Sequence, residues 1–174
     1  MGESIRMAVL SDLPRLVELS LASFGPITWQ RTVDRVFGPL NGHDWRDRWT
    51  RRVKKIMQEQ TILVLEQDGV IVGYACGTVD QVLGLGHIEI LAVDPAWMGK
   101  GYGRRVLQVM EEHFLSQGAA HVTLESLLGN ETANSLYSKQ GYQQVASHIN
   151  WFKKLQRRED SQDGPPGPAG SRTR

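Results

Sequence analysis

Residues 94–105 read DPAWMGKGYGRR and directly follow an apolar run that is typical of a strand. Pro95 ends that strand, three glycines follow at alternate positions (Gly99, Gly101 and Gly103), and a helical pattern then begins. Glycine lets the backbone adopt positive φ and approach a ligand closely. A helix start offers unpaired N–H groups to an anion. The cations Lys100 and Arg104 oppose the helix dipole unless a polyanion binds there. The loop therefore predicts a phosphate site, and the alternative is a flexible turn with solvated charges.

The glycine spacing excludes two common phosphate motifs. A dinucleotide fingerprint read from Gly99 requires glycine at position 104, where the chain has Arg104. A P-loop requires a Gly-Lys-Ser/Thr sequence, which does not follow.

A second informative stretch, NETANSLYSKQGY, covers residues 130–142. On a helix, its members at i, i+3, i+4 and i+7 share one face, namely Ala133, Leu136, Tyr137 and Gln140. Tyr137 therefore points inward, where a hydroxyl requires a hydrogen-bond partner. These residues alone leave two interpretations open, a core tyrosine bonded to a carbonyl and a functional tyrosine.

Two predicted strands carry candidate acid–base groups on their polar faces. In residues 87–93, alternation puts His87 and Glu89 on one face and the apolar Ile88, Ile90 and Ala92 on the other. In residues 121–125, the outward face consists of His121, Thr123 and Glu125. If the two strands are neighbours that splay apart, both polar faces line one cleft. For each candidate the alternative is a surface carboxylate or a backbone-bonded imidazole, and for His121 we prefer that alternative.

Strand and helix patterns alternate along the chain. The expected strands are Ile5–Val9, Thr61–Glu66, Val70–Asp80, His87–Val93 and His121–Leu127, with one or two more in Tyr142–Leu155. The expected helices begin near Leu13, lie once or twice within residues 24–60, and cover Gly103–Gln117 and Glu131–Gln140. Asp68-Gly69 predicts a hairpin turn. Strands followed by helices favour an α/β (α+β) fold with a mixed sheet covered by helices.

Composition limits the protein class. The 174 residues predict one domain, residues 1–156, followed by a disordered tail, residues 157–174, that is rich in Gly and Pro and poor in large apolar residues. A net charge of +1 gives no support for a nucleic-acid or membrane partner. A single cysteine, Cys76, excludes an internal disulfide. Without a signal-peptide pattern or a long apolar run, we expect a cytoplasmic protein that is a monomer or homodimer.

Both glycine-loop and tyrosine motifs resemble those of the GNAT superfamily of N-acetyltransferases. The first matches its Arg/Gln-x-x-Gly-x-Gly/Ala motif at Gly101 and Gly103, although Met98 stands where the family has Arg or Gln. The second is similar to the signature N-x-x-A-x-x-L-Y-x-x-x-G-F, with Tyr142 at the last position. The resemblance covers about residues 4–155, and its motif spacing is closest to ribosomal-protein alanine N-acetyltransferases.

The resemblance implies a GNAT fold, a mostly antiparallel sheet of six to seven strands flanked by about four helices. It also implies acetyl-CoA as acyl donor, bound between the strands ending at Val93 and Leu127, with no metal. The residues expected to contact acetyl-CoA are Leu91, Ala92, Val93, Met98, Gly99, Lys100, Gly101, Tyr102, Gly103, Arg104, Asn130 and Tyr137.

The resemblance further assigns catalytic roles. Tyr137 matches the tyrosine that protonates the departing thiolate. Acyl transfer also requires a neutral amine. Glu125, five residues before Asn130, matches the proton acceptor proposed in the alanine N-acetyltransferases and ranks first; Glu89 and then His87 follow, and direct attack with water as relay stays open. The expected acceptor is a primary amine on a peptide N-terminus, a lysine or a small molecule. The alternatives are a non-catalytic acyl-CoA sensor and a nucleotide-binding module.

The segment expected to flank the acceptor is residues 24–57. Its tryptophans Trp29, Trp45 and Trp49 either wall the acceptor groove or pack in the core, and we favour packing for the last two. The basic run Arg46–Lys55 is interpreted as a solvated helix face.

Overall fold

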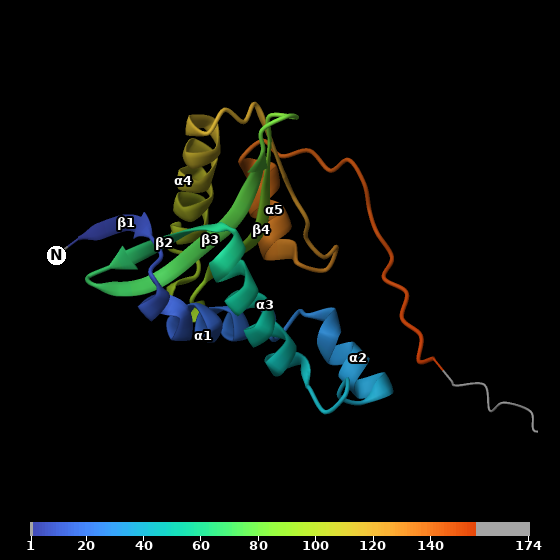
Figure 1. The fold of residues 1–174 in the computed structure, drawn as a ribbon. Coiled ribbons are helices and arrows are strands. Elements are labelled where there is room, and N and C mark those ends of the chain that lie inside the picture. The colour runs from blue at the N-terminus through green and yellow to red at the C-terminus, as the bar shows by residue number, and fades with distance from the viewer. Residues whose placement is uncertain (1, 156–174) are drawn as a thin grey trace, which may run out of the picture.

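The computed structural model describes residues 2–155, which form a five-stranded mixed sheet covered by helices on both faces (Figure 1). The strands lie in chain order: β1 (Glu3–Met7), β2 (Thr61–Gln67), β3 (Val70–Asp80), β4 (Leu85–Val93) and β5 (His121–Leu124). The first four pair with one another in antiparallel fashion, whereas β5 runs parallel to β4. The predicted α/β class with a mixed, mostly antiparallel sheet is confirmed.

A two-residue turn joins β2 to β3, as Asp68-Gly69 predicts. Both turn residues have positive φ, 53° at Asp68 and 82° at Gly69. This conformation matches the right-handed twist of the flanking strands, which is why Asp-Gly is favoured there.

Residues 2–155 contain five α-helices: α1 (Leu13–Phe24), α2 (Trp29–Phe37), α3 (Trp45–Glu59), α4 (Tyr102–Ser116) and α5 (Glu131–Lys139). All but α2 cover a face of the sheet, whereas α2 packs against α3 (Figure 1). Alternate strand residues separate two apolar clusters, one with α1 and α3 and the other with α4. Trp45 and Trp49 are buried in the first cluster, which confirms them as packing residues, whereas Trp29 is exposed.

The expectation of six to seven strands was wrong, because residues 143–155 pair with no strand. After α5 this segment leaves the body of the sheet and runs past α2 in extended form (Figure 1). A strand exists only through its ladder of backbone hydrogen bonds, so β-like composition alone does not make one. The predicted tail, residues 157–174, lies outside the described residues.

Strand β5 is also shorter than expected, ending at Leu124 and not at Leu127. The Asn134 side chain of α5 donates hydrogen bonds to the carbonyls of Leu127 (3.0 Å) and Leu128 (3.1 Å). These bonds hold the chain in a turn that leads into α5, so the backbone leaves β4 early.

Candidate active site

The β4–β5 ladder is short and opens into a fork. Its register runs from Leu85 opposite His121 to Ile88 opposite Leu124, and the pairing stops there. Glu89 is the next residue of β4, and Glu125 directly follows the end of β5. Two of the candidate proton acceptors therefore lie directly at the fork, where β4 no longer has β5 as a neighbour.

Glu89 lies in a β-bulge. In β3 the consecutive residues Cys76 and Gly77 pair with Ile90 and Ile88 of β4, so Glu89 is the extra residue. A bulge disrupts strict alternation and redirects side chains. The prediction of one common apolar face on β4 was therefore wrong, because Ile88 packs in the α4 cluster while Ile90 packs in the cluster of α1 and α3.

The bulge directs the Glu89 carboxylate toward α3, where Arg52 binds it. Arg52 donates from Nε (3.1 Å) and Nη2 (2.5 Å) to Glu89 Oε1. Nε2 of His87 lies 3.4 Å from the other oxygen, Oε2. The Arg52 guanidinium also lies over the Trp49 ring, 5.0 Å from its centroid. Both oxygens of Glu89 are thus engaged, and Glu89 joins Arg52 and His87 into one cluster.

Arg52 is a site residue that the sequence did not reveal. Its place in a run of cations suggested a solvated face, and parts of that face are indeed exposed. Only helical spacing could have indicated that Arg52 lies near the sheet. On α3 it falls on the same side as the buried residues Trp49, Val53 and Ile56.

Glu125 differs from Glu89 in its surroundings. It is exposed, and no ion pair or side-chain hydrogen bond engages it within residues 2–155. His87 lies opposite Thr123 in the ladder, whereas His121 lies at the far end of β5, opposite Leu85. The structure therefore brings His87, Glu89 and Glu125 to one region and leaves His121 outside it.

Asp94 anchors the loop that connects β4 to α4. Its carboxylate accepts hydrogen bonds from the Ala96 N–H (2.8 Å) and from Arg15 Nη2 (2.5 Å). Desolvation raises the pKa of Asp94, but these hydrogen bonds and the Arg15 charge outweigh it and hold the pKa below its ordinary value. Arg15 also donates to the Ile71 carbonyl (3.1 Å), so α1, β3 and the loop are joined by one side chain.

Gly99 and Gly101 give the loop its conformation. Their φ angles are 76° and 89°, a region that favours glycine, and Gly101 is the N-cap of α4. A Cβ added at either position meets no protein atom within 4 Å. Gly103 differs, because a Cβ there comes within 3.3 Å of Leu136 Cδ2, so this glycine allows α4 and α5 to pack closely. Open space above the first two glycines fits a ligand that approaches the backbone.

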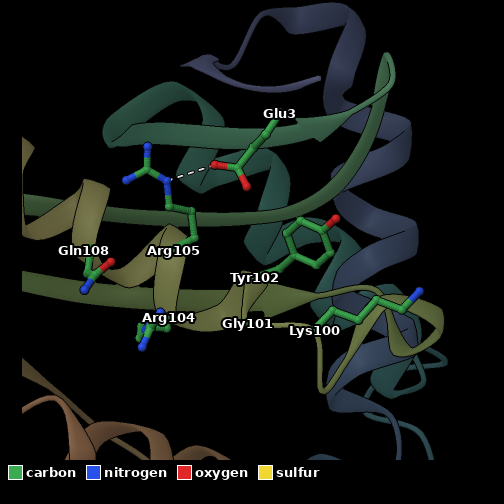
Figure 2. A pocket seen from close by; sticks show the side chains of 7 residues that line it. All are labelled: Glu3, Lys100, Gly101, Tyr102, Arg104, Arg105 and Gln108. Atoms are coloured by element: carbon green, nitrogen blue, oxygen red, sulfur yellow. Dashed lines mark hydrogen bonds and ion pairs between the residues drawn. The ribbon is translucent and has the colours of Figure 1, made fainter. Parts of the chain in front are cut away.

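A pocket of about 290 Å³ lies beside the first turn of α4 (Figure 2). It is lined by Glu3, Lys100, Gly101, Tyr102, Arg104, Arg105 and Gln108. Glu3 accepts a hydrogen bond from Arg105 Nε (2.9 Å), and Lys100 Nζ lies 4.6 Å from the Trp97 ring centroid. Arg104 points to the opposite side of α4 from Tyr102 (Figure 2). A helix start with three nearby cations suits a polyanion such as a pyrophosphate.

The other residues predicted to contact acetyl-CoA differ in how deeply they are buried. Ala92 and Val93 are buried in β4, Leu91 is partly buried, and Met98 is 47% exposed. The Asn130 side chain caps α5 by accepting from the Ala133 N–H (3.4 Å).

Tyr137 lies on the half-buried face of α5, and its ring centroid is 5.8 Å from that of Tyr142. The Tyr142 hydroxyl donates to Glu111 Oε1 (2.8 Å). The Tyr137 hydroxyl has no hydrogen-bond partner in the described part of the chain. Burial raises the pKa of Tyr137, so its phenol stays protonated at neutral pH.

The described residues provide neither a metal site nor a membrane-spanning helix. Across residues 2–155, no group of three or more His, Cys, Asp or Glu side chains is arranged to hold a metal ion. In the same residues, no helix combines the length and the apolar character needed to cross a bilayer.

Known proteins resemble the chain over this same region. The model of the acetyltransferase (GNAT) family matches residues 27–142. The [ribosomal protein bS18]-alanine N-acetyltransferase of Haemophilus ducreyi is 30% identical over 87 residues, which cover 50% of this chain and 58% of that relative. The chain thus spans little more than half the length of that curated relative.

Solved structures share the fold. The crystal structure of the ribosomal-protein-S18-alanine N-acetyltransferase from Escherichia coli aligns with a TM-score of 0.62 at 19% identity, covering 83% of this chain and 79% of that one. The PaiA N-acetyltransferase from Thermoplasma acidophilum, solved in complex with coenzyme A, aligns with a TM-score of 0.64 at 19% identity, covering 82% and 91%. At these identities the likeness shows the fold.

Proposed function

Because this chain belongs to the acetyltransferase (GNAT) family, we propose that it transfers an acetyl group from acetyl-CoA to a primary amine. The observation that carries the proposal is the fork at Ile88 and Leu124, which has candidate acid–base groups beside it. A glycine-rich helix start, that of α4, follows the end of β4. The acceptor class is an amine of a peptide N-terminus, a lysine or a small molecule.

The loop between β4 and α4 binds the pyrophosphate of the donor in this proposal. The open space above Gly99 and Gly101 lets phosphate oxygens reach backbone N–H groups at the start of α4. Lys100 and Arg104 add positive charge. The Met98 side chain has no assigned contact, because backbone groups do the binding. Asn130 acts through its cap on α5, which positions Tyr137.

Tyr137 acts as the general acid. When the amine nitrogen bonds to the thioester carbon and the C–S bond breaks, the thiolate takes the phenolic proton of Tyr137. One observation suits this role: the hydroxyl has no hydrogen-bond partner within residues 2–155, so it is free to donate to the thiolate.

Glu125 is the first choice as proton acceptor for the amine. Its carboxylate is exposed and unpaired among the described residues, so it is free to accept a proton. Glu89 is held by Arg52, which makes it better suited to orient His87 than to take a proton itself.

Acetyl transfer to a panel of amines and peptides, together with calorimetric titration of CoA, tests the proposal. Tyr137→Phe should lower kcat by about 10²–10⁴-fold and leave the CoA Kd unchanged, since only the proton donor is lost. Tyr142→Phe is the matched control, because that neighbouring hydroxyl is bound to Glu111, and it should retain turnover.

The variants Glu125→Gln and Glu89→Gln separate the two candidate bases. Glu125→Gln should change the pH dependence of kcat/KM. Glu89→Gln should change the magnitude of kcat/KM more than its pH dependence. A non-catalytic acyl-CoA sensor would bind CoA and turn over no amine in the panel. Absence of CoA binding by the intact chain would refute the proposal as a whole.

A further inference from the structure

The side chain of Asn134, in α5, binds three consecutive residues of the turn that follows β5. Its Nδ2 donates to the carbonyls of Leu127 (3.0 Å) and Leu128 (3.1 Å). Its Oδ1 accepts from the hydroxyl of Ser126. An asparagine amide has two N–H donors and one acceptor oxygen, so this side chain uses all of its hydrogen-bonding groups on the turn.

Little else holds this turn in place. Ser126 and Leu128 are exposed, and a Cβ added at Gly129 meets no atom within 4 Å. Within residues 2–155, the turn of residues 126–129 makes one other hydrogen bond, from the Asn130 N–H to the Leu127 carbonyl (2.9 Å). With so few packing contacts, the conformation of the turn depends mainly on Asn134.

Glu125 lies between two fixed points of the backbone. Before it, Leu124 pairs with Ile88 in the last step of the ladder between β4 and β5. After it, Ser126 is bound by Asn134. The Glu125 carboxylate itself is exposed and engages no other side chain among the described residues. Its position is therefore set by the backbone on both sides and not by contacts of its own.

Helix α5 also carries Tyr137. Asn134 and Tyr137 are three residues apart, a spacing that places them on the same side of the helix. The helix that bears the proposed proton donor thus also holds the segment that bears the proposed proton acceptor.

We propose that Asn134 is a positioning residue, which fixes Glu125 at the fork in a constant relation to Tyr137. This inference rests on the proposed function. Asn134 is neutral, so it supplies position without adding charge beside the carboxylate. If its amide is removed, the turn can relax and Glu125 can move away from the acceptor nitrogen.

A double-mutant cycle tests the role of Asn134. Asn134→Ala should lower kcat by about 10–10²-fold, because displacing an acid–base group by about 1 Å can cost that much rate. The CoA Kd from calorimetric titration should stay unchanged. In the Glu125→Gln background, Asn134→Ala should lower kcat by less than about twofold, since no carboxylate is left to position. In the Tyr137→Phe background the full loss should remain. Equal losses in the wild-type and Glu125→Gln backgrounds would overturn the proposal.

Asp80→Ala is the matched control. The Asp80 carboxylate also binds the backbone of a turn, accepting from the N–H groups of Val82 (2.9 Å) and Leu83 (3.0 Å) between β3 and β4. Both variants lose two bonds between one side chain and a turn, so both should lower Tm to a similar extent. Only Asn134→Ala should lower kcat, and an equal loss of kcat in Asp80→Ala would overturn the proposal.

The wild-type chain separates this inference from the proposed function. A wild-type chain that binds CoA and acetylates no amine of the panel would refute the proposed function and this inference with it. Turnover by the wild type that Asn134→Ala retains in full would refute this inference alone.

Discussion

Replacing Gly101 by alanine tests whether the loop before α4 approaches a ligand. Gly101 has φ 89° and ψ −4° and is the N-cap of α4. A methyl group at this position meets no protein atom within 4 Å. Any effect on the free protein must therefore come from the backbone conformation and not from a clash.

The conformational cost follows from the φ angle. An alanine held in the left-handed region costs roughly 1–2 kcal/mol. For a chain of this size, each kcal/mol lowers Tm by about 2–4 °C. If a phosphate group occupies the open space, the added methyl also blocks its approach to the backbone, and CoA affinity falls at least about tenfold, which is about 1.4 kcal/mol.

Gly69→Ala is the matched control. Gly69 has φ 82° and equally open space around its Cβ position, but it lies in the turn between β2 and β3. Both variants should show similar losses of Tm in a thermal melt, and only Gly101→Ala should raise the CoA Kd in a calorimetric titration. Equal CoA affinity in the two variants would refute the assignment of this space to the donor.

Two further predictions concern stability. Gly86→Ala should destabilise the protein by about 1–3 kcal/mol in a denaturant titration, because its Cβ would lie 2.3 Å from Phe114 Cδ2 in a packed core; an unchanged midpoint would contradict the tight contact. The hydrogen bond from Arg6 holds the pKa of Asp12 below its ordinary value. Asp12→Asn should therefore cost about 1 kcal/mol at pH 7, a modest figure because Arg6 is 37% exposed. Since the pKa is lowered in the folded state, this difference should persist above about pH 4 and shrink as pH falls through the folded pKa; a difference that is the same at pH 3 and pH 7 would contradict the ion pair.

Local chemistry made much of this fold predictable. Pro95 and the alternate glycines mark the passage from strand to helix, and Asp68-Gly69 marks a hairpin, because these residues restrict or release φ directly. The position of Tyr137 on the inner face of α5 likewise follows from helical spacing.

The features that escaped prediction depend on pairing between distant segments. The bulge at Glu89 arises from the register between β3 and β4, and no local pattern in β4 announces it. Arg52 reaches Glu89 only because α3 packs across that part of the sheet. Residues 143–155 have a strand-like composition, yet within the described residues they have no partner strand, so composition could not decide their structure.

The short length of β5 shapes the proposed acyl-transfer site. Hydrogen bonds from Asn134 to the carbonyls of Leu127 and Leu128 turn the chain toward α5 and limit the parallel ladder to four residue pairs. The early end of the ladder opens the fork, which a thioester and an amine would have to enter. Among residues 2–155, β5 pairs with β4 alone. A longer ladder would close the fork, so the turn into α5 sets the opening of the site.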